Sequence, residues 1–103
     1  MRILTRKTLR QFWESEPRHV VAKGPLEAWH AEAEAATWKT PADVKEQFRN
    51  ASVLQDSRVV FNIKGNDYRL IVKINYPMQL VRVLWIGTHE DYDDIDVMKV
   101  GKP

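Results

Sequence analysis

Hydrophobic and polar residues alternate most regularly between residues 58 and 87, and this stretch predicts three β-strands joined by two tight turns. It reads RVVFNIK, GN, DYRLIVKINY, PMQ and LVRVLWIG. Gly65-Asn66 is a two-residue hairpin signal, because glycine accepts a positive φ at the first turn position and asparagine tolerates one at the second. With this pair at the tip, the register runs outward until Arg58 faces Lys73.

Side chains alternate along a strand, so the hairpin residues divide between two faces of the predicted sheet. The first face is apolar and is expected to pack on the core; it carries Val59, Phe61, Ile63, Tyr68, Leu70, Val72 and Ile74. The second face is polar apart from Val60 and Ile71; it carries Arg58, Asn62, Lys64, Asp67, Arg69 and Lys73.

The third strand extends both faces. A tight turn in the PMQ segment places Arg82 beside Lys73, so that Arg58, Lys73 and Arg82 form a cationic row across the sheet. The apolar face then gains Val81, Val83 and Trp85.

Helical patterns lie before and after the strands. Leu9, Phe12 and Trp13 recur at helical spacing, and LEAWHAEAEAA is rich in strong helix formers. Thr40 begins a sequence typical of a capping box, with proline at the first helical position. Thr88 is a good N-cap, because the acids that follow it suit the positive end of a helix dipole.

The predicted order is therefore an edge strand at residues 1–5, two or three helices, a run of antiparallel strands and a short last helix. Such a chain is expected to form an α+β domain, with the N-terminal helices packed on one face of a small antiparallel sheet and the cationic face left open. The length of 103 residues suits one domain over residues 1–103. We expect a frayed tail after the last helix, through Lys102-Pro103.

Composition limits the possible functions. The sequence has no cysteine, and no apolar run approaches the roughly 20 residues that span a bilayer. The first residues lack the apolar region of a signal peptide, so we expect a cytoplasmic protein without a membrane partner. Residues 52–87 have five Lys/Arg and two Asp/Glu, whereas residues 88–103 have two and five. The predicted sheet is thus basic, which favours a nucleic-acid backbone as ligand, although an ordinary solvated sheet face has the same pattern.

Three side chains at one end of the sheet are candidates for chemistry. Arg69 has a planar guanidinium suited to phosphate, and the alternative is a surface arginine held by Asn62. His89 follows the last strand, and an imidazole titrates near neutral pH; a lone histidine is also often structural. Tyr92 lies three residues further, on the same side of a helix, where its ring could instead cap the core.

Together these groups suit the cleavage of RNA without a metal ion. The ribose 2′-OH attacks the adjacent phosphate, an acid or base such as His89 transfers a proton, and Arg69 with Lys64 or Lys73 stabilises the charge. The sequence has no HExxH pair or other metal spacing, so no metal and no cofactor are predicted. The predicted catalytic residues are Arg69, His89 and Tyr92. The predicted RNA-binding residues are Asn62, Lys64, Asn66, Lys73, Arg82 and Arg58.

Three stretches carry a family resemblance: MRILTRKTL, VVFNIKGNDYRLIV and VRVLWIGTHEDYD. In this order they resemble the HigB-type toxins of bacterial toxin–antitoxin modules, within the wider RelE-like superfamily of mRNA interferases. The resemblance implies a RelE-like fold and an endoribonuclease that cuts mRNA, in much of the superfamily on the ribosome. It implies a HigA-like helix-turn-helix antitoxin, through which alone the toxin reaches operator DNA. The family's arginine, histidine and tyrosine fall on Arg69, His89 and Tyr92.

A second interpretation stays open, namely a non-catalytic module that binds RNA or the ribosome with the same basic face. His89 and Tyr92 distinguish the two, because a protein that only binds has no need of them. A neighbouring gene for a small helix-turn-helix protein favours the toxin.

Overall fold

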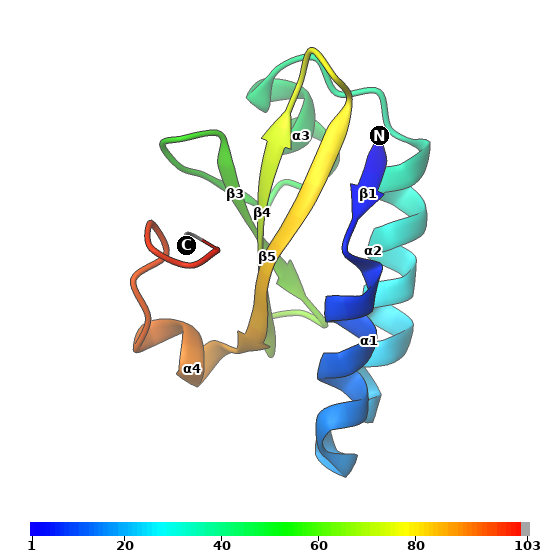
Figure 1. Cartoon of the computed structure of the whole chain (residues 1–103), viewed down its shortest axis with the longest axis vertical. Helices are drawn as coiled ribbons and strands as arrows, with labels where there is room; N and C mark the ends of the chain where they lie inside the picture. Colours follow the sequence, from blue (N-terminus) through cyan, green and yellow to red (C-terminus); the bar gives the residue numbers. More distant parts are fainter. Residues whose placement is uncertain (102–103) are drawn as a thin grey trace.

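A five-stranded mixed sheet forms the centre of the molecule, with the N-terminal helices on one face and the last helix and C-terminal segment on the other (Figure 1). This computed structural model describes residues 1–101. The strand order is β1-β5-β4-β3-β2. The strands are β1 (Arg2–Leu4), β2 (Ser52–Val53), β3 (Arg58–Ile63), β4 (Tyr68–Asn75) and β5 (Leu80–Thr88). The helices are α1 (Arg6–Ser15), the 3-10 helix η1 (Pro17–Ala22), α2 (Lys23–Ala35), α3 (Pro41–Gln47) and α4 (His89–Asp93). The predicted α+β class is confirmed.

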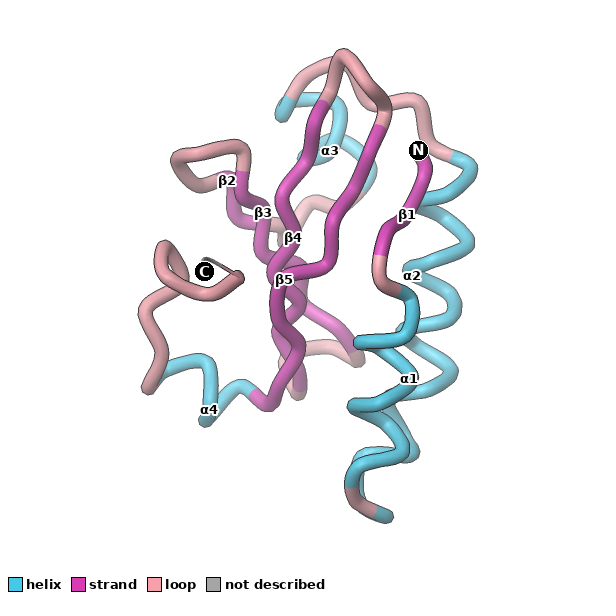
Figure 2. Tube along the Cα trace, viewed as in Figure 1, coloured by secondary structure: helices cyan, strands magenta, loops and turns pink. Residues whose placement is uncertain are grey.

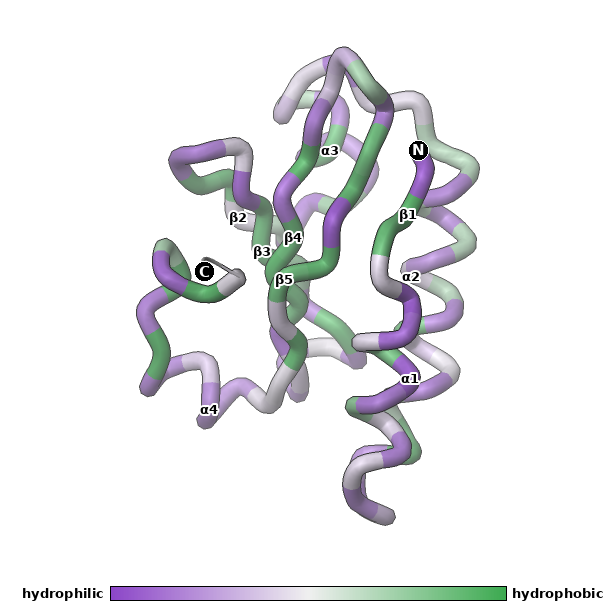
Figure 3. The backbone as a smooth tube through the Cα atoms, in the orientation of Figure 1, coloured by the Kyte–Doolittle hydropathy of each residue, from purple (hydrophilic) through white to green (hydrophobic). Residues whose placement is uncertain are grey.

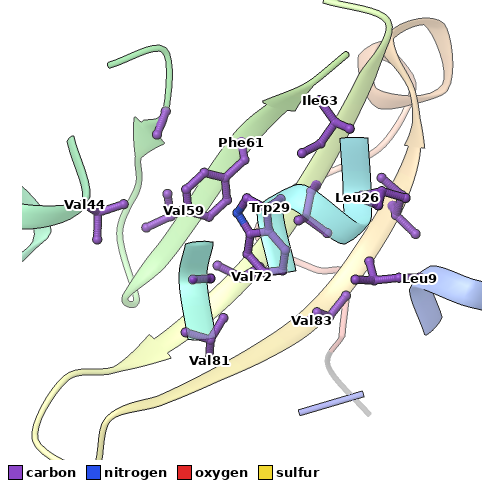
Figure 4. Packing of buried hydrophobic residues seen from close by; sticks show 14 of the residues in the cluster. Leu9, Leu26, Trp29, Val44, Val59, Phe61, Ile63, Val72, Val81 and Val83 are labelled. Carbon is purple, nitrogen blue, oxygen red and sulfur yellow. The ribbon is translucent and has the colours of Figure 1, made fainter. Parts of the chain in front are cut away.

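The core lies between the helices and the apolar face of the sheet (Figure 4). Trp29 of α2 meets Phe61 of β3 edge to face, with ring centroids 5.4 Å apart, and Leu70 and Val72 of β4 are fully buried beside them. Truncating such a residue to alanine costs about 2–5 kcal/mol, because the cavity it leaves refills only in part. The predicted apolar face of the hairpin is thus confirmed as the core face.

The register of the β3–β4 hairpin is also confirmed, from Ile63 opposite Tyr68 to Arg58 opposite Lys73. The geometry of its tip differs from the prediction. Positive φ angles occur at Lys64 and Gly65, at 53° and 65°, rather than at Gly65 and Asn66. Residues 64–67 lie beyond the last strand pair, and the Asp67 amide donates to the Lys64 carbonyl at 3.2 Å.

The N-terminal strand makes the sheet mixed rather than wholly antiparallel. β1 pairs with β5 in parallel, with Ile3 opposite Val81. The amino group of Met1, just before β1, donates hydrogen bonds to the carbonyls of Glu34 and Ala36, at the end of α2. The N-terminus is therefore held between the sheet and the helical layer, as Figure 1 shows.

A β-bulge in β5 moves Trp85 to the other face. Val72 pairs with Val83, but Ile71 pairs with Trp85, so Leu84 is the extra residue. A bulge inverts the alternation beyond it. The prediction that Trp85 lies on the core face is therefore wrong, and Ile86 is buried in the core instead.

The cationic face is not open along its whole length. The C-terminal segment, residues 96–101, folds back over it, on the side of the sheet away from the helices (Figure 2). Arg58 is only 2% exposed, and its Nη1 donates to the carbonyls of Val97 and Val100 at 2.9 and 2.8 Å. The prediction of an exposed Arg58 that binds RNA is therefore wrong, because this guanidinium anchors the chain's own C-terminal segment. The predicted frayed tail is corrected for residues 96–101, while Lys102 and Pro103 lie outside the described residues.

Two helix starts agree with the sequence. Thr40 and Asp43 form the reciprocal capping box at α3, and the Thr88 hydroxyl accepts a hydrogen bond from the Asp91 amide at α4. Figure 3 shows that β4 and β5 are mainly hydrophobic with a few hydrophilic residues between, whereas α4 is mainly hydrophilic. Within residues 1–101, none of the helices has the length and apolar character needed to cross a membrane.

Candidate active site at the uncovered end of the sheet

Arg69 lies on β4, on the face away from the helices and near the hairpin tip. Its strand partners are Asn62 on one side and Gly87 on the other. Its Nη1 donates to the carbonyls of Asn66 at 3.0 Å and Tyr68 at 3.3 Å. The side chain is half-buried, so the sheet orients the guanidinium while part of it stays accessible to a ligand.

Helix α4 carries Tyr92 to the same place. The Cζ atom of Arg69 lies 5.8 Å from the centre of the Tyr92 ring, within the range of a cation–π contact. The ring of Trp85 is also close, with centroids 6.3 Å apart. The Thr88 cap fixes the start of this short helix, so the capping bond determines where Tyr92 lies.

His89 is the first residue of α4 and is about half-exposed, at 50%. Its amide donates to the Asp67 carbonyl at 3.0 Å, and its Nδ1 lies 3.9 Å from the Asp93 carboxylate. The side chain lines a groove of about 420 Å³ between α4, the hairpin tip and η1. Other residues lining this groove include Arg18, Asn66, Asp67, Tyr68 and Thr88.

The hairpin tip joins Arg69 to this groove. The Arg69 side chain donates to the Asn66 carbonyl, and the His89 backbone amide donates to the Asp67 carbonyl. The two candidate residues are therefore both bound to the hairpin tip, at adjacent residues. Lys64 forms an exposed ion pair with Asp67 at 2.9 Å. The hydrogen bond that Lys64 donates to the Asp67 carboxylate, and the charge of that carboxylate, raise the pKa of the Lys64 ammonium, which stays charged. Asn62 donates to the Asn66 side chain at 3.3 Å.

Lys73 and Arg82 lie at the other end of the same face. They are strand partners, as predicted, and both line a second groove beside the β4–β5 turn. Lys73 pairs with Asp56 at 3.2 Å, and Arg82 donates to the Gly101 carbonyl at 3.4 Å. Lys73 lies four positions along β4 from Arg69, which corresponds to about 13 Å. The predicted cationic row is thus two exposed groups, with Arg58 buried next to them.

The structure therefore brings together Arg69, Tyr92 and the hairpin tip, and places His89 in the adjoining groove. His89 and Tyr92 have different neighbours: Asp93 lies beside His89, and Arg69 and Trp85 lie beside Tyr92. Two residues of this region are missed by the sequence pattern. Arg18 reaches the groove from η1, a segment with no clear period, and Trp85 is displaced by the bulge.

These groups are suited to a phosphate ester. A guanidinium and an ammonium attract a phosphate, and an imidazole in the adjoining groove can donate or accept a proton. Carboxylates are also present, because Glu90 and Asp91 lie in the first turn of α4. Among residues 1–101, no three His, Cys, Asp or Glu side chains form a group that could hold a metal ion.

Fold and site together define the class. Helices on one face of a small mixed sheet, with basic and aromatic groups at the end of the other face, are consistent with the RelE-like architecture. The chain belongs to the HigB toxin family, whose model describes a RelE-like toxic component of a toxin–antitoxin system and matches residues 22–95.

Individual relatives agree with this assignment. The chain is 27% identical over 95 residues to the mRNA interferase toxin HigB of Escherichia coli strain K12, across 90% of this chain and 88% of the relative. The mRNA interferase HigB of Escherichia coli O157:H7 and that of Shigella flexneri are similar to the same extent. The resemblance found in the sequence motifs is therefore confirmed.

Proposed function

We propose that this protein is the toxin of a type II toxin–antitoxin module and acts as an endoribonuclease on mRNA, so that it inhibits translation. Membership of the toxin family and the names of the relatives support this activity. The observation that carries the proposal is the placing of Arg69 against Tyr92, next to the groove that His89 lines. A guanidinium held in this way suits a phosphate, and Asn66, whose carbonyl it binds, also lines the groove of His89.

In the proposed reaction the ribose 2′-OH attacks the adjacent phosphorus and the bond to the 5′ oxygen breaks. Arg69 stabilises the charge that develops on the phosphoryl oxygens, a role for which donors fixed in advance are most effective. The Lys64 ammonium assists, because its exposed ion pair with Asp67 is worth under about 1 kcal/mol and releases it readily. Tyr92 positions the substrate beside Arg69.

His89 transfers the proton in this scheme. Its Nδ1 faces Asp93, so Nε2 is the nitrogen that remains for the substrate. A neutral imidazole accepts the proton of the 2′-OH, and a protonated one donates a proton to the leaving 5′ oxygen, so His89 suits either role. The products are then a 2′,3′-cyclic phosphate and a 5′-OH, and the reaction requires no metal ion.

The decisive experiment combines product analysis with His89→Gln. Purified protein is mixed with RNA, alone and on ribosomes, and the new ends are identified. His89→Gln is expected to bind RNA normally and to slow single-turnover cleavage about 100-fold or more. His30→Gln is the matched control, because the same substitution then falls in α2, within the helical layer. New 5′-phosphate ends, or full activity in His89→Gln, would overturn the mechanism.

The same measurement tests the alternative of a module that only binds RNA or the ribosome. The groove of Lys73 and Arg82, about 13 Å from Arg69 along β4, is the observation that favours binding without chemistry. A toxin that blocks growth equally well with His89→Gln and Tyr92→Phe, and leaves RNA intact, would establish this alternative.

We also propose the partners that follow from the module. The toxin acts in the cytoplasm on mRNA, on the ribosome, and a HigA-like helix-turn-helix antitoxin inhibits it and connects it to operator DNA. Expression of the protein alone should stop growth, and coexpression of a helix-turn-helix gene from the same operon should restore it. Growth arrest that the adjacent gene product leaves unchanged would remove that partner.

A further inference from the structure

Trp85 differs from the other three tryptophans of the chain. Trp13, Trp29 and Trp38 are buried in the core, at 6%, 2% and 3% exposure. Trp85 is half-buried on the opposite face, because the bulge at Leu84 inverts the alternation of β5. A large aromatic side chain thus lies at the end of the sheet where Arg69 and Tyr92 meet.

Gly87 makes room for the Trp85 ring. A Cβ atom at position 87 would lie 2.4 Å from Cη2 and 2.5 Å from Cζ2 of Trp85, much closer than atoms approach. The six-membered ring therefore covers the backbone of Gly87. The ring thus extends along β5 to Gly87, and Gly87 is the strand partner of Arg69, the residue proposed to bind the phosphate.

Tyr92 completes the arrangement from α4. Its ring centroid is 6.3 Å from that of Trp85, and the two planes are tilted by 49°. Rings at this angle are not stacked on each other, so each retains a face for another flat group. Arg69 lies over Tyr92 at 5.8 Å and adds a positive charge to this aromatic corner. Aromatic rings next to a phosphate-binding arginine suit a nucleotide, because the base can stack on a ring while its phosphate binds the guanidinium.

We propose that Trp85, lying on Gly87, forms with Tyr92 a stacking platform for one unpaired RNA base, beside the phosphate bound by Arg69. This proposal rests on the proposed function and adds to it the feature of the substrate that is recognised. A base must be unstacked from its neighbours to occupy the platform, so single-stranded RNA is the preferred form. Stacking is tolerant of base identity, and the platform therefore contributes affinity and position more than sequence preference.

Tryptophan fluorescence tests this directly. A short RNA with 2′-deoxy nucleotides at the cleavage position binds but cannot react by attack of the 2′-OH. Because the other tryptophans are buried, quenching on binding is expected to come from Trp85, and Trp85→Phe should abolish most of it. Trp85→Ala should weaken binding about 10-fold, whereas Trp85→Phe should keep most of the affinity.

An abasic nucleotide separates stacking from a structural role. Removing the base should weaken binding to the parent by a similar factor, and should have little effect on Trp85→Ala, since the partner is already lost. If Trp85 has only a structural role, Trp85→Ala should lose the same factor of affinity for the intact RNA and for the abasic RNA. Gly87→Ala, which displaces the ring, should resemble Trp85→Ala, and Met78→Ala at the exposed β4–β5 turn is the control that keeps normal binding.

The outcomes distinguish this inference from the proposed function. If the parent cleaves RNA but Trp85→Ala binds and cleaves equally well, the platform is overturned and the nuclease stands. Loss of antitoxin binding in Trp85→Ala with unchanged RNA affinity would also overturn it. If the parent does not cleave RNA, the proposed function fails, while quenching by the deoxy-substituted RNA still decides whether a base stacks on Trp85.

Discussion

Arg69 is oriented by its own strand and hairpin. Two backbone carbonyls accept from its Nη1, and the face of Tyr92 lies below its charge. These contacts hold the guanidinium in place without neutralising it, since a carbonyl dipole and a ring quadrupole leave the net charge intact. The residue therefore combines a fixed position with an accessible positive charge, which is the arrangement that stabilises a developing anion most effectively.

We predict that Arg69→Ala lowers the single-turnover cleavage rate by about 100- to 1,000-fold, the usual loss for one stabilising donor. The thermal melting curve should change little, because the side chain lies outside the core cluster. Arg69→Lys tests the geometry, since an ammonium keeps the charge but lacks the planar fork, and it should restore only part of the rate. Full toxicity in folded Arg69→Ala would exclude this residue from catalysis.

At the scale of elements, α4 is short and depends on its cap. Its five residues carry both His89 and Tyr92, and the Thr88 hydroxyl accepts from the Asp91 amide at 3.1 Å. The hydrogen bond from the His89 amide to the Asp67 carbonyl also attaches the start of this helix to the hairpin tip. Both candidate residues therefore share the orientation of one turn of helix.

We predict that Thr88→Ala reduces kcat more than it reduces RNA affinity, because it loosens the residues that perform the chemistry. The capping bond is worth about 1 kcal/mol, so the melting temperature should fall only by a few degrees. Thr88→Ser keeps the hydroxyl and should behave as the parent. Single-turnover rates and binding to the deoxy-substituted RNA provide the two readouts, and equal losses in both would contradict the positioning role.

Much of the sheet is predictable from the sequence, because local signals determine it. The turn residues around Gly65 and the alternation on either side fix the β3–β4 register without reference to the rest of the chain. The face of Trp85 is not predictable in this way, since a bulge adds one residue and reverses the pattern beyond it. Arg69 is found on the predicted face because its strand has no such interruption.

Contacts between distant parts of the chain explain the other differences. In the sequence, Arg58 is indistinguishable from the other cations of the polar face. Only the folded structure shows that its guanidinium donates to the carbonyls of Val97 and Val100 in the C-terminal segment. The parallel pairing of β1 depends on the path of the chain through two helices before it returns to β5. Arg18 reaches the His89 groove for the same reason, from a segment whose sequence has no strand or helix period.

The C-terminal segment is an element in its own right, anchored by Arg58. We predict that Arg58→Ala destabilises the protein by about 3 kcal/mol, because two hydrogen bonds from a buried guanidinium are lost and their carbonyl acceptors are left unpaired. Amide hydrogen exchange at residues 97–101 should rise far more than exchange at core strand β4. Arg82→Ala, which removes only a 3.4 Å contact to Gly101, is the control. Unchanged exchange in the C-terminal segment would refute the anchoring role.

At the scale of the whole molecule, the polar face of the sheet has three parts. Arg69, Trp85 and Tyr92 occupy one end, the C-terminal segment covers the centre, and Lys73 and Arg82 line the groove at the other end. Residues 96–101 carry one aspartate and one lysine, so this segment meets the basic face through the carbonyls of Val97 and Val100 rather than through net charge. A single-stranded RNA held at Arg69 has a second cationic site within about 13 Å.

This separation gives a prediction about salt. Each phosphate neutralised by a cation releases counterions, and log K for a single strand falls with log salt by about 0.7 per contact. Lys73→Gln together with Arg82→Gln should therefore lower the slope by about 1.4 and weaken binding most at low salt. Arg58 is expected to contribute nothing to this slope, because its guanidinium is buried and already bound.

The measurement uses a deoxy-substituted RNA that is long enough to reach from Arg69 to Lys73. Its affinity is determined over a series of salt concentrations. Lys23→Gln with Lys39→Gln is the matched control: it removes the same charge from exposed positions at the start of α2 and beyond its end, and should leave the slope unchanged. A smaller slope in both double variants would indicate a general effect of net charge. An unchanged slope in the Lys73 and Arg82 variant would show that the RNA does not reach this end of the sheet, and that Arg69 and its neighbours bind it alone.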